Sequence, residues 1–332
     1  PMAEPLLEIE GLRVEFDTRD GVATVIDGLD ISLYPGEILG IVGESGCGKS
    51  MTALSVMRLV PVPPGRIAKG TIRLDGEDLL QVSEKRMRGV RGNEISMIFQ
   101  EPMTSLNPVF SVGDQIAETI LLHEGGGKRA ARRRAVEMLD AVGIPAAEIR
   151  AGEYPHQMSG GMRQRVMIAM ALACKPRVLI ADEPTTALDV TVQAQIFDLL
   201  KDLQEKTGAV IVLITHDMGA IAEMAQRVVV MYAGRKVEDG PVDEILTNPK
   251  HPYTAGLIGC VPHLSSDPAE ERLPLTDIPG MVPPLTRLGQ GCPFAPRCVK
   301  ALAKCRLEMP PKSVVSEGHT ASCWLIENDG PR

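Results

Sequence analysis

The sequence is poor in aromatic residues and has no long apolar run. Phe, Trp and Tyr make up 3% of its 332 residues, too few for the stacking platforms that bind single-stranded nucleic acids. The formal net charge of −8 also disfavours a nucleic-acid partner, because a phosphate backbone attracts a basic surface. No run of eighteen apolar residues and no signal peptide is recognisable, so we expect neither a membrane-spanning helix nor export. These absences favour a folded cytosolic protein without nucleic-acid partners.

The cysteines do not form the even framework of a secreted protein. Three of the seven are scattered and are interpreted as small buried hydrophobes: Cys47, Cys174 and Cys260. The other four cluster near the end, and clustered cysteines in a reducing cytosol more often bind metal than pair as disulfides: Cys292, Cys298, Cys305 and Cys323. Their spacing, C-x5-C-x6-C-x17-C, lacks the tight knuckle that structural zinc prefers. Because four thiolates also suit an iron–sulfur cluster, the residues alone leave zinc and iron–sulfur open.

A strand, a glycine loop and a helix start follow one another in EILGIVGESGCGKSMTALSVM. Gly43, Gly48, Lys49 and Ser50 fit the phosphate-loop pattern G-x-x-x-x-G-K-[ST]. The glycines permit a tight loop whose backbone N–H groups face phosphate oxygens, and the helix start adds a favourable potential for an anion. Lys49 is expected to reach the β- and γ-phosphates, and the Ser50 hydroxyl to bind Mg²⁺. A chance glycine turn is disfavoured, since the strand and the helix stand on the correct sides.

Two further segments predict catalytic groups at strand ends. In RVLIADEPTTALD, Asp182 ends an apolar strand and is expected to hold the Mg²⁺, while Glu183 is placed to polarise an attacking water as general base. Alone, this acidic pair could be a helix cap, but the phosphate loop makes that interpretation improbable. His216 ends a third apolar strand, where its imidazole could donate a hydrogen bond to the γ-phosphate.

A second anion-binding helix start is predicted in QMSGGMRQRVMIAMALA. Ser159, Gly160 and Gly161 precede apolar residues at helical spacing, and Arg163 and Arg165 add positive charge. The structural interpretation is an N-cap followed by a glycine turn.

Together these motifs resemble those of the ATP-binding subunits of ABC transporters, over residues 5 to 260. GESGCGKS matches the Walker A motif, VLIADEP the Walker B motif and MSGGMRQR the signature motif, in which Met158 and Met162 replace the commoner leucine and glutamine. Residues 187–189 match the D-loop, Gln100 the Q-loop and His216 the switch histidine. Phe16 is the best candidate for the aromatic residue that stacks on adenine in this family.

The resemblance implies a set of site residues. The catalytic residues are expected to be Glu183, His216 and Gln100. The nucleotide-binding residues are expected to be Phe16, Gly43, Ser45, Gly46, Cys47, Gly48, Lys49, Ser50, Met51, Asp182, Ser159, Gly160, Gly161 and Asp189. The Mg²⁺ ligands are expected to be Ser50, Gln100 and Asp182.

The implied fold is α/β: a RecA-like P-loop NTPase core of the ABC type, with an antiparallel β subdomain and a helical subdomain. We predict the ATP-binding domain at 5–245, with the helical subdomain at about 103–161. Its run KRAARRRA is interpreted as a solvated helix face rather than a nucleic-acid site. A proline-rich, loop-like extension with the four cysteines occupies 246–332.

This extension narrows the resemblance. NPKHPYTAGLIGCVP, Asn248 to Pro262, followed by CPFAPRC, is similar to the ATPase subunits of dipeptide and oligopeptide permeases. That group implies import of peptides, with nickel or glutathione as alternative cargoes, and it points to a [4Fe–4S] cluster on Cys292, Cys298, Cys305 and Cys323, with zinc as the alternative. We expect the cluster to be structural.

The family also implies partners and a location. Two ATPase domains pack head to tail, so that Ser159 serves the nucleotide of the partner, which the family suggests is a paralogue. Two transmembrane permease subunits and a substrate-binding protein complete the complex, at the cytoplasmic face of the bacterial inner membrane. The alternative, a soluble ABC-type ATPase of DNA repair or translation, is disfavoured because only about a hundred residues separate the phosphate loop from the signature and one cassette is present.

Overall fold

A computed structural model describes residues 4–100, 105–186, 188–260 and 278–326. The chain divides into two compact units, and each is described by itself. The first comprises residues 1–6, 33–38 and 77–214, and the second comprises residues 7–32, 39–76 and 215–332. In the described residues, no helix is both long and apolar enough to cross a membrane.

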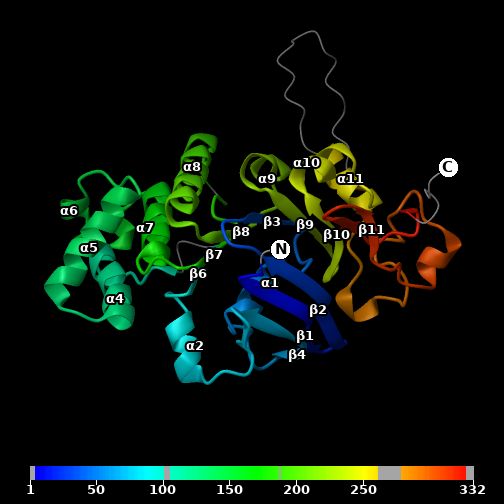
Figure 1. Cartoon of the computed structure of the whole chain (residues 1–332), viewed down its shortest axis with the longest axis horizontal. Helices are drawn as coiled ribbons and strands as arrows, with labels where there is room; N and C mark the ends of the chain where they lie inside the picture. Colours follow the sequence, from blue (N-terminus) through cyan, green and yellow to red (C-terminus); the bar gives the residue numbers. More distant parts are fainter. Residues whose placement is uncertain (1–3, 101–104, 187, 261–277, 327–332) are drawn as a thin grey trace, which may run out of the picture. The chain divides into compact units, whose positions relative to one another are not determined.

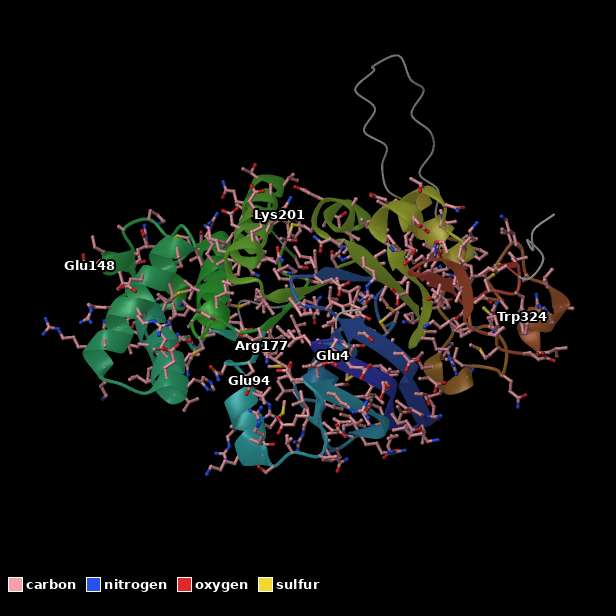
Figure 2. All side chains as sticks on the ribbon, in the orientation of Figure 1. Glu4, Glu94, Glu148, Arg177, Lys201 and Trp324 are labelled. Carbon is pink, nitrogen blue, oxygen red and sulfur yellow. The ribbon has the colours of Figure 1, made fainter. Side chains whose placement is uncertain are left out.

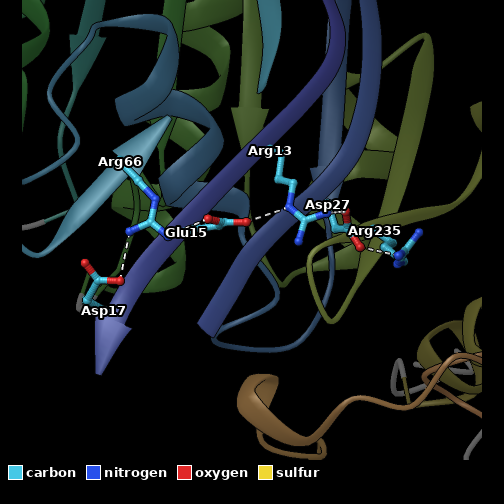
Figure 3. A network of polar contacts seen from close by, with 6 residues as sticks. All are labelled: Arg13, Glu15, Asp17, Asp27, Arg66 and Arg235. Atoms are coloured by element: carbon cyan, nitrogen blue, oxygen red, sulfur yellow. Dashed lines mark hydrogen bonds and ion pairs between the residues drawn. The ribbon is translucent and has the colours of Figure 1, made fainter. Parts of the chain in front are cut away.

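The second unit contains an antiparallel β part. Strands β1 (Leu7–Thr18) and β4 (Gly65–Leu74) pair antiparallel, and β2 (Gly21–Leu33) lies on the other side of β1. Buried residues alternate with more exposed ones along β1, as expected for strands with one face in the core. The polar face carries a chain of ion pairs (Figure 3) that runs through these residues: Asp17, Arg66, Glu15, Arg13, Asp27 and Arg235.

The same unit contains a mixed group of strands with the chain's C-terminal segment added at one side. Strand β3 runs parallel to β9, and β9, β10, β12 and β11 follow in antiparallel pairs. The strand bounds are β3 Ile38–Val42, β9 Arg227–Tyr232, β10 Arg235–Pro241, β11 Ser313–Ser316 and β12 His319–Ala321. The helices are α1 Lys49–Val56, α9 Met218–Met224, α10 Val242–Thr247 and α11 Pro252–Gly259, with single 3-10 turns at Leu285–Arg287 and Ala303–Arg306.

The first unit is built on three parallel strands, β6 (Ile95–Ile98), β7 (Val178–Asp182) and β8 (Val210–Ile214). Every residue of these strands is buried, which fits their largely apolar sequences, interrupted only by Ser96 in β6 and Asp182 at the end of β7. The unit also contains β5 (Glu77–Asp78), α2 (Glu84–Val90) and α8 (Val190–Thr207). Arg177 and Val178 both donate backbone N–H groups to the Glu94 carbonyl, which fixes the starts of β6 and β7 (Figure 2).

The helical part of this unit gathers α4, α5, α6 and α7 at one end of it (Figure 1). The bounds are α4 Val112–Glu124, α5 Lys128–Ala141, α6 Ala147–Arg150 and α7 Gly160–Leu172, with a 3-10 turn at Pro155–Gln157. Helix α5 buries Ala131, Ala135 and Leu139, while Arg132 and Arg134 form ion pairs with acidic residues of α4. The predicted solvated basic face is therefore confirmed.

Candidate nucleotide site and cysteine segment

The loop between β3 and α1 requires glycine at two positions. Gly43 has φ +151°, and a Cβ there would lie 2.2 Å from the carbonyl oxygen of Met231. Gly48 caps α1 with φ +105°, in the left-handed region that side chains disfavour. The strand–loop–helix order predicted for 43–50 is therefore present, and its close backbone approach explains why a larger residue does not fit at Gly43.

The ammonium group of Lys49 is held inside this loop. Lys49 is 5% exposed, and its Nζ donates to the carbonyl oxygens of Gly43 at 2.6 Å and Glu44 at 3.2 Å. The neighbouring Cys47 is buried, as predicted, and this burial raises the pKa of its thiol. The other predicted loop residues follow the same segment: Ser45 and Gly46 are exposed, and Ser50 and Met51 are half-buried.

Phe16 lies on β1 in the same unit. It stands opposite Gly65 in the β1–β4 ladder, and its ring occupies the space where a Cβ on Gly65 would be, at 2.7 Å. The side chain is half-buried, so part of the ring remains available to a ligand. Its role in stacking on adenine stays a prediction.

Glu44, which the sequence motifs did not predict as a site residue, is held by residues far along the chain through both its side chain and its backbone. Its carboxylate forms a two-pronged ion pair with Arg297, with Nη1–Oε2 at 2.6 Å and Nη2–Oε1 at 3.0 Å. Its backbone N–H donates to the Tyr253 hydroxyl at 2.8 Å. A glutamate in a loop that binds an anion is unusual, and this could have indicated that its charge is neutralised by a partner. The partner, Arg297, lies 253 residues away along the chain, so the sequence does not identify it.

In the first unit, the structure brings two predicted catalytic residues together. Gln100 Nε2 donates to Glu183 Oε2 at 3.2 Å, and the Thr186 hydroxyl donates to the same oxygen at 2.9 Å. Glu183 has φ +46°, a strained conformation that accumulates at functional sites, and its N–H donates to the Ile214 carbonyl at the end of β8. Asp182, 3% exposed, is the last residue of β7. The carboxylate of Glu183 is thus oriented by two donors.

The signature segment begins α7. The exposed Ser159 is its N-cap, with its hydroxyl accepting from the Met162 N–H at 3.3 Å, and Gly160 and Gly161 follow as the first helical residues. The two arginines hydrogen-bond neutral oxygen atoms, which position their side chains but leave their positive charge in place. Arg165 donates to the Val142 carbonyl and to Gln195, each at 2.6 Å, and Arg163 donates to the Pro155 carbonyl at 3.4 Å.

The remaining motif residues lie at helix starts. Asp189 is the exposed N-cap of α8, accepting from the Val192 N–H at 3.0 Å; Ala187 of the D-loop lies outside the described residues. His216 is exposed and precedes Asp217, the N-cap of α9. In the second unit the preceding Thr215 donates its N–H to the Ile41 carbonyl, which holds the start of this segment against β3.

The four C-terminal cysteines face one small cavity of about 20 Å³. The Cys292 N–H donates to the Cys305 carbonyl at 2.7 Å, and burial raises the pKa values of Cys298 and Cys323 and that of Cys292 to about 11. Trp324 (Figure 2) closes the segment, with Lys304 Nζ 3.6 Å from its ring centre. In the described part of the chain, no three or more His, Cys, Asp or Glu side chains are arranged to hold a metal ion, so the cysteines converge without forming an ion site as they stand.

Two family models match the chain. Residues 26–186 match the model described as ABC transporter, and residues 237–305 match the model described as oligopeptide/dipeptide transporter, C-terminal region. The first match begins in β2 and includes the phosphate loop and the signature segment, and the second begins within β10 and ends at Cys305.

Named relatives align over nearly the whole chain. The oligopeptide transport ATP-binding protein OppD of Bacillus subtilis is 52% identical, over 98% of this chain and 90% of its own length. The dipeptide transport ATP-binding protein DppD of the same organism is 50% identical, over 97% and 95%. A dimeric ATP-binding cassette solved in a post-hydrolysis state with ADP and Pi superimposes with a TM-score of 0.64 and 26% identity, over 71% of this chain and 98% of that one. The predicted α/β cassette fold is thereby confirmed.

Proposed function

Since the chain belongs to the family of ABC transporter ATP-binding proteins, we propose that it powers the import of dipeptides or oligopeptides. The main support for a peptide cargo is the match of residues 237–305 to the C-terminal region of oligopeptide and dipeptide transporters. Relatives at 50% and 52% identity carry peptide-transport names, which supports the same cargo class. The chain is an ATPase, and its hydrolysis of ATP is the step that drives transport.

The roles of the motif residues form the chemical part of the proposal. Lys49 would leave its loop carbonyls and bind the β- and γ-phosphates, and Glu183 would accept a proton from the attacking water. Ser50, Asp182 and Gln100 would hold the Mg²⁺. Mg²⁺ would neutralise charge that develops on the phosphates. The hydrogen bonds from Gln100 and Thr186 support this role, because they hold the Glu183 carboxylate in one orientation. His216 is proposed to donate to the γ-phosphate.

The assembly is proposed from the signature motif. Ser159, Gly160 and Gly161 form an exposed or half-buried helix start that would bind the nucleotide of a second ATPase subunit, which we propose is a paralogue. Asp189 would contribute to nucleotide binding as well, and Phe16 would stack on the adenine of the nucleotide that this chain's own phosphate loop binds. Two transmembrane permease subunits and a substrate-binding protein would complete an importer at the cytoplasmic face of the inner membrane.

We propose that residues 5–245 form the ATP-binding domain and that residues 246–332 form a C-terminal domain. Within the C-terminal domain, the four cysteines are proposed to hold a [4Fe–4S] cluster, with zinc as the alternative. The donor chemistry fits, because four thiol groups line one cavity and four cysteines ligate such clusters. The present cavity of about 20 Å³ holds little more than one water, so the side chains have to move apart around a cluster. Its role would be structural. Anaerobic purification should give a brown protein with about four irons per chain, and colourless protein with stoichiometric zinc would refute the cluster.

The decisive test of the function uses the assembled transporter in proteoliposomes. Glu183→Gln should retain ATP binding and lose most hydrolysis and peptide uptake, because the phosphate loop survives while the water loses its base. Lys49→Ala should weaken nucleotide binding itself. The matched control is Glu205→Gln, which removes an exposed carboxylate from α8 and should leave all three quantities unchanged. Normal turnover in the Glu183 variant would refute its assignment as base, and ATP hydrolysis without uptake of any peptide would refute the cargo.

A further inference from the structure

The C-terminal segment, residues 246–332, contacts the phosphate loop through Arg297 and Tyr253. Arg297 is 8% exposed, and its side chain reaches Glu44 with both terminal nitrogens. Such two-pronged guanidinium–carboxylate pairs are stronger and more directional than single-contact ion pairs. The pair raises the pKa of Arg297 still further, so the guanidinium stays charged at every relevant pH.

The rest of the Arg297 side chain is fixed by the segment around it. Its Nε donates to the Pro279 carbonyl at 2.9 Å, and its Nη2 also donates to the Ile278 carbonyl at 3.0 Å. Its guanidinium carbon lies 5.9 Å from the ring centres of both Tyr232 and Phe294, within the range of cation–π attraction. The arginine therefore arrives at the loop in one orientation, which the folding of the segment determines.

Arg297 also lies inside the cysteine sequence, between Cys292 and Cys298. Its backbone N–H donates to the Phe294 carbonyl at 2.9 Å, in the turn that joins these two cysteines. Tyr253 of α11 makes a second contact with the loop, because its hydroxyl accepts a hydrogen bond from the Glu44 N–H. Both the side chain and the backbone of Glu44 are thus held by residues of the C-terminal segment.

The charge of Glu44 gives this contact a consequence for ligand binding. A carboxylate in a phosphate-binding loop repels a bound polyphosphate, and the repulsion is strong at the low effective dielectric near a protein surface. Arg297 neutralises that carboxylate by pairing with both of its oxygen atoms. A loop with an unpaired Glu44 would bind the same nucleotide less tightly.

We propose that Arg297 is a positioning residue for nucleotide binding, through which the C-terminal cysteine segment neutralises and orients Glu44 of the phosphate loop. The inference rests on the proposed phosphate-binding role of residues 43–50. It gives the segment a function inside the ATPase itself, in addition to any contact with other subunits. A segment that loses its fold would weaken ATP binding, because it withdraws Arg297 from Glu44.

The test measures the Kd for Mg-ATP of the full-length chain by calorimetry. Arg297→Gln should raise this Kd by about tenfold, the order expected for one uncompensated unit charge near a polyphosphate at an effective dielectric of about 20. The increase should shrink at 0.5 M salt, since added ions screen the repulsion. The matched control is Arg306→Gln, an exposed arginine of the same segment, which should leave the Kd unchanged.

A second substitution separates charge from folding. Adding Glu44→Gln to Arg297→Gln removes the uncompensated carboxylate, and the double variant should recover most of the lost affinity. If Arg297→Gln weakened binding by any route other than the uncompensated charge of Glu44, the double variant would bind as weakly as the single one, and the proposal would be overturned. An unchanged Kd in Arg297→Gln would overturn it as well. Lys49→Ala is measured in parallel as a control for the assignment of residues 43–50 as the phosphate loop. If that assignment is right, Lys49→Ala raises the Kd for Mg-ATP; an unchanged Kd in Lys49→Ala would show that the assignment itself is wrong.

Discussion

Acidification should destabilise the C-terminal segment through one buried histidine. His251 is 2% exposed, and burial lowers its pKa from 6.5 to about 4. Its Nδ1 accepts the Tyr253 N–H at 3.1 Å at the start of α11, and the backbone N–H of His251 donates to the Glu238 carboxylate at 2.9 Å. The folded protein therefore keeps this imidazole neutral, whereas the unfolded chain protonates it below pH 6.5.

The magnitude follows from the difference in pKa. Between pH 6.5 and 4 the unfolded state binds more protons than the folded state, so the free energy of unfolding falls as the pH falls. A shift from 6.5 to about 4 corresponds to a loss of about 2 kcal/mol at pH 5 and about 3 kcal/mol at pH 4, relative to pH 7.5. This loss is a large share of the stability of a typical domain.

The assay uses the chain's single tryptophan, Trp324, which lines the same cavity as His251. Urea titrations followed by its fluorescence report unfolding of this segment rather than of the whole chain, with metal content assayed at each pH. His251→Asn keeps a residue that can cap α11 and removes the titration. Between pH 7.5 and pH 5, the free energy of unfolding of His251→Asn should fall by about 2 kcal/mol less than that of the parent protein.

Other titrating groups lie nearby, so the comparison between variants carries the result. His319 hydrogen-bonds Glu238 and Glu244 and is present in both proteins. His156→Asn, at an exposed position, is the matched control and should follow the parent at every pH. Parallel pH profiles for the parent protein and His251→Asn would show that burial does not suppress protonation of His251, and would refute the reasoning.

Three further substitutions test individual contacts. Gly43→Ala should abolish measurable Mg-ATP binding by calorimetry, because the new Cβ would lie 2.2 Å from the Met231 carbonyl oxygen; retained affinity would contradict the loop geometry. Arg165→Ala removes the hydrogen bonds to Val142 and Gln195 and should lower the stability of the helical part by about 1–3 kcal/mol in urea titrations, whereas an unchanged midpoint would show that water replaces them. Asp17→Asn breaks an exposed pair of the network in Figure 3 and should leave the melting temperature unchanged within error, because such surface pairs contribute little; a marked, salt-dependent drop would mean that the network acts cooperatively.

The parts of the fold that the sequence predicted are those with local signals. The glycines of residues 43–48 and the apolar strand before them mark a strand, a loop and a helix start within about fifteen residues, and the structure places all three there. Asp182 was predicted at a strand end because the apolar run stops there, and it is the last residue of β7. Local spacing suffices where the backbone conformation itself requires the residue type.

The contacts that the sequence did not predict join distant segments. Glu44 and Arg297 form an ion pair across 253 residues, and Glu238 and His319 form a hydrogen bond across 81. No periodicity or spacing reports which of many charged side chains will meet after folding. The sequence predicted the positive charge of Arg163 and Arg165 but not the carbonyl oxygens of Pro155 and Val142 to which they donate. No sequence motif marks a backbone carbonyl as a hydrogen-bond partner.

The buried charges of the C-terminal segment explain why its order and that of the phosphate loop depend on each other. Arg297, with a side chain that is 4% exposed, costs free energy unless Glu44 compensates it, because a buried charge without a partner is strongly unfavourable. The dependence therefore runs both ways: loss of Arg297 exposes the loop to an unpaired carboxylate, and loss of Glu44 leaves a buried cation beside Cys298. The phosphate loop consequently stabilises the cysteine segment as much as the segment orients the loop.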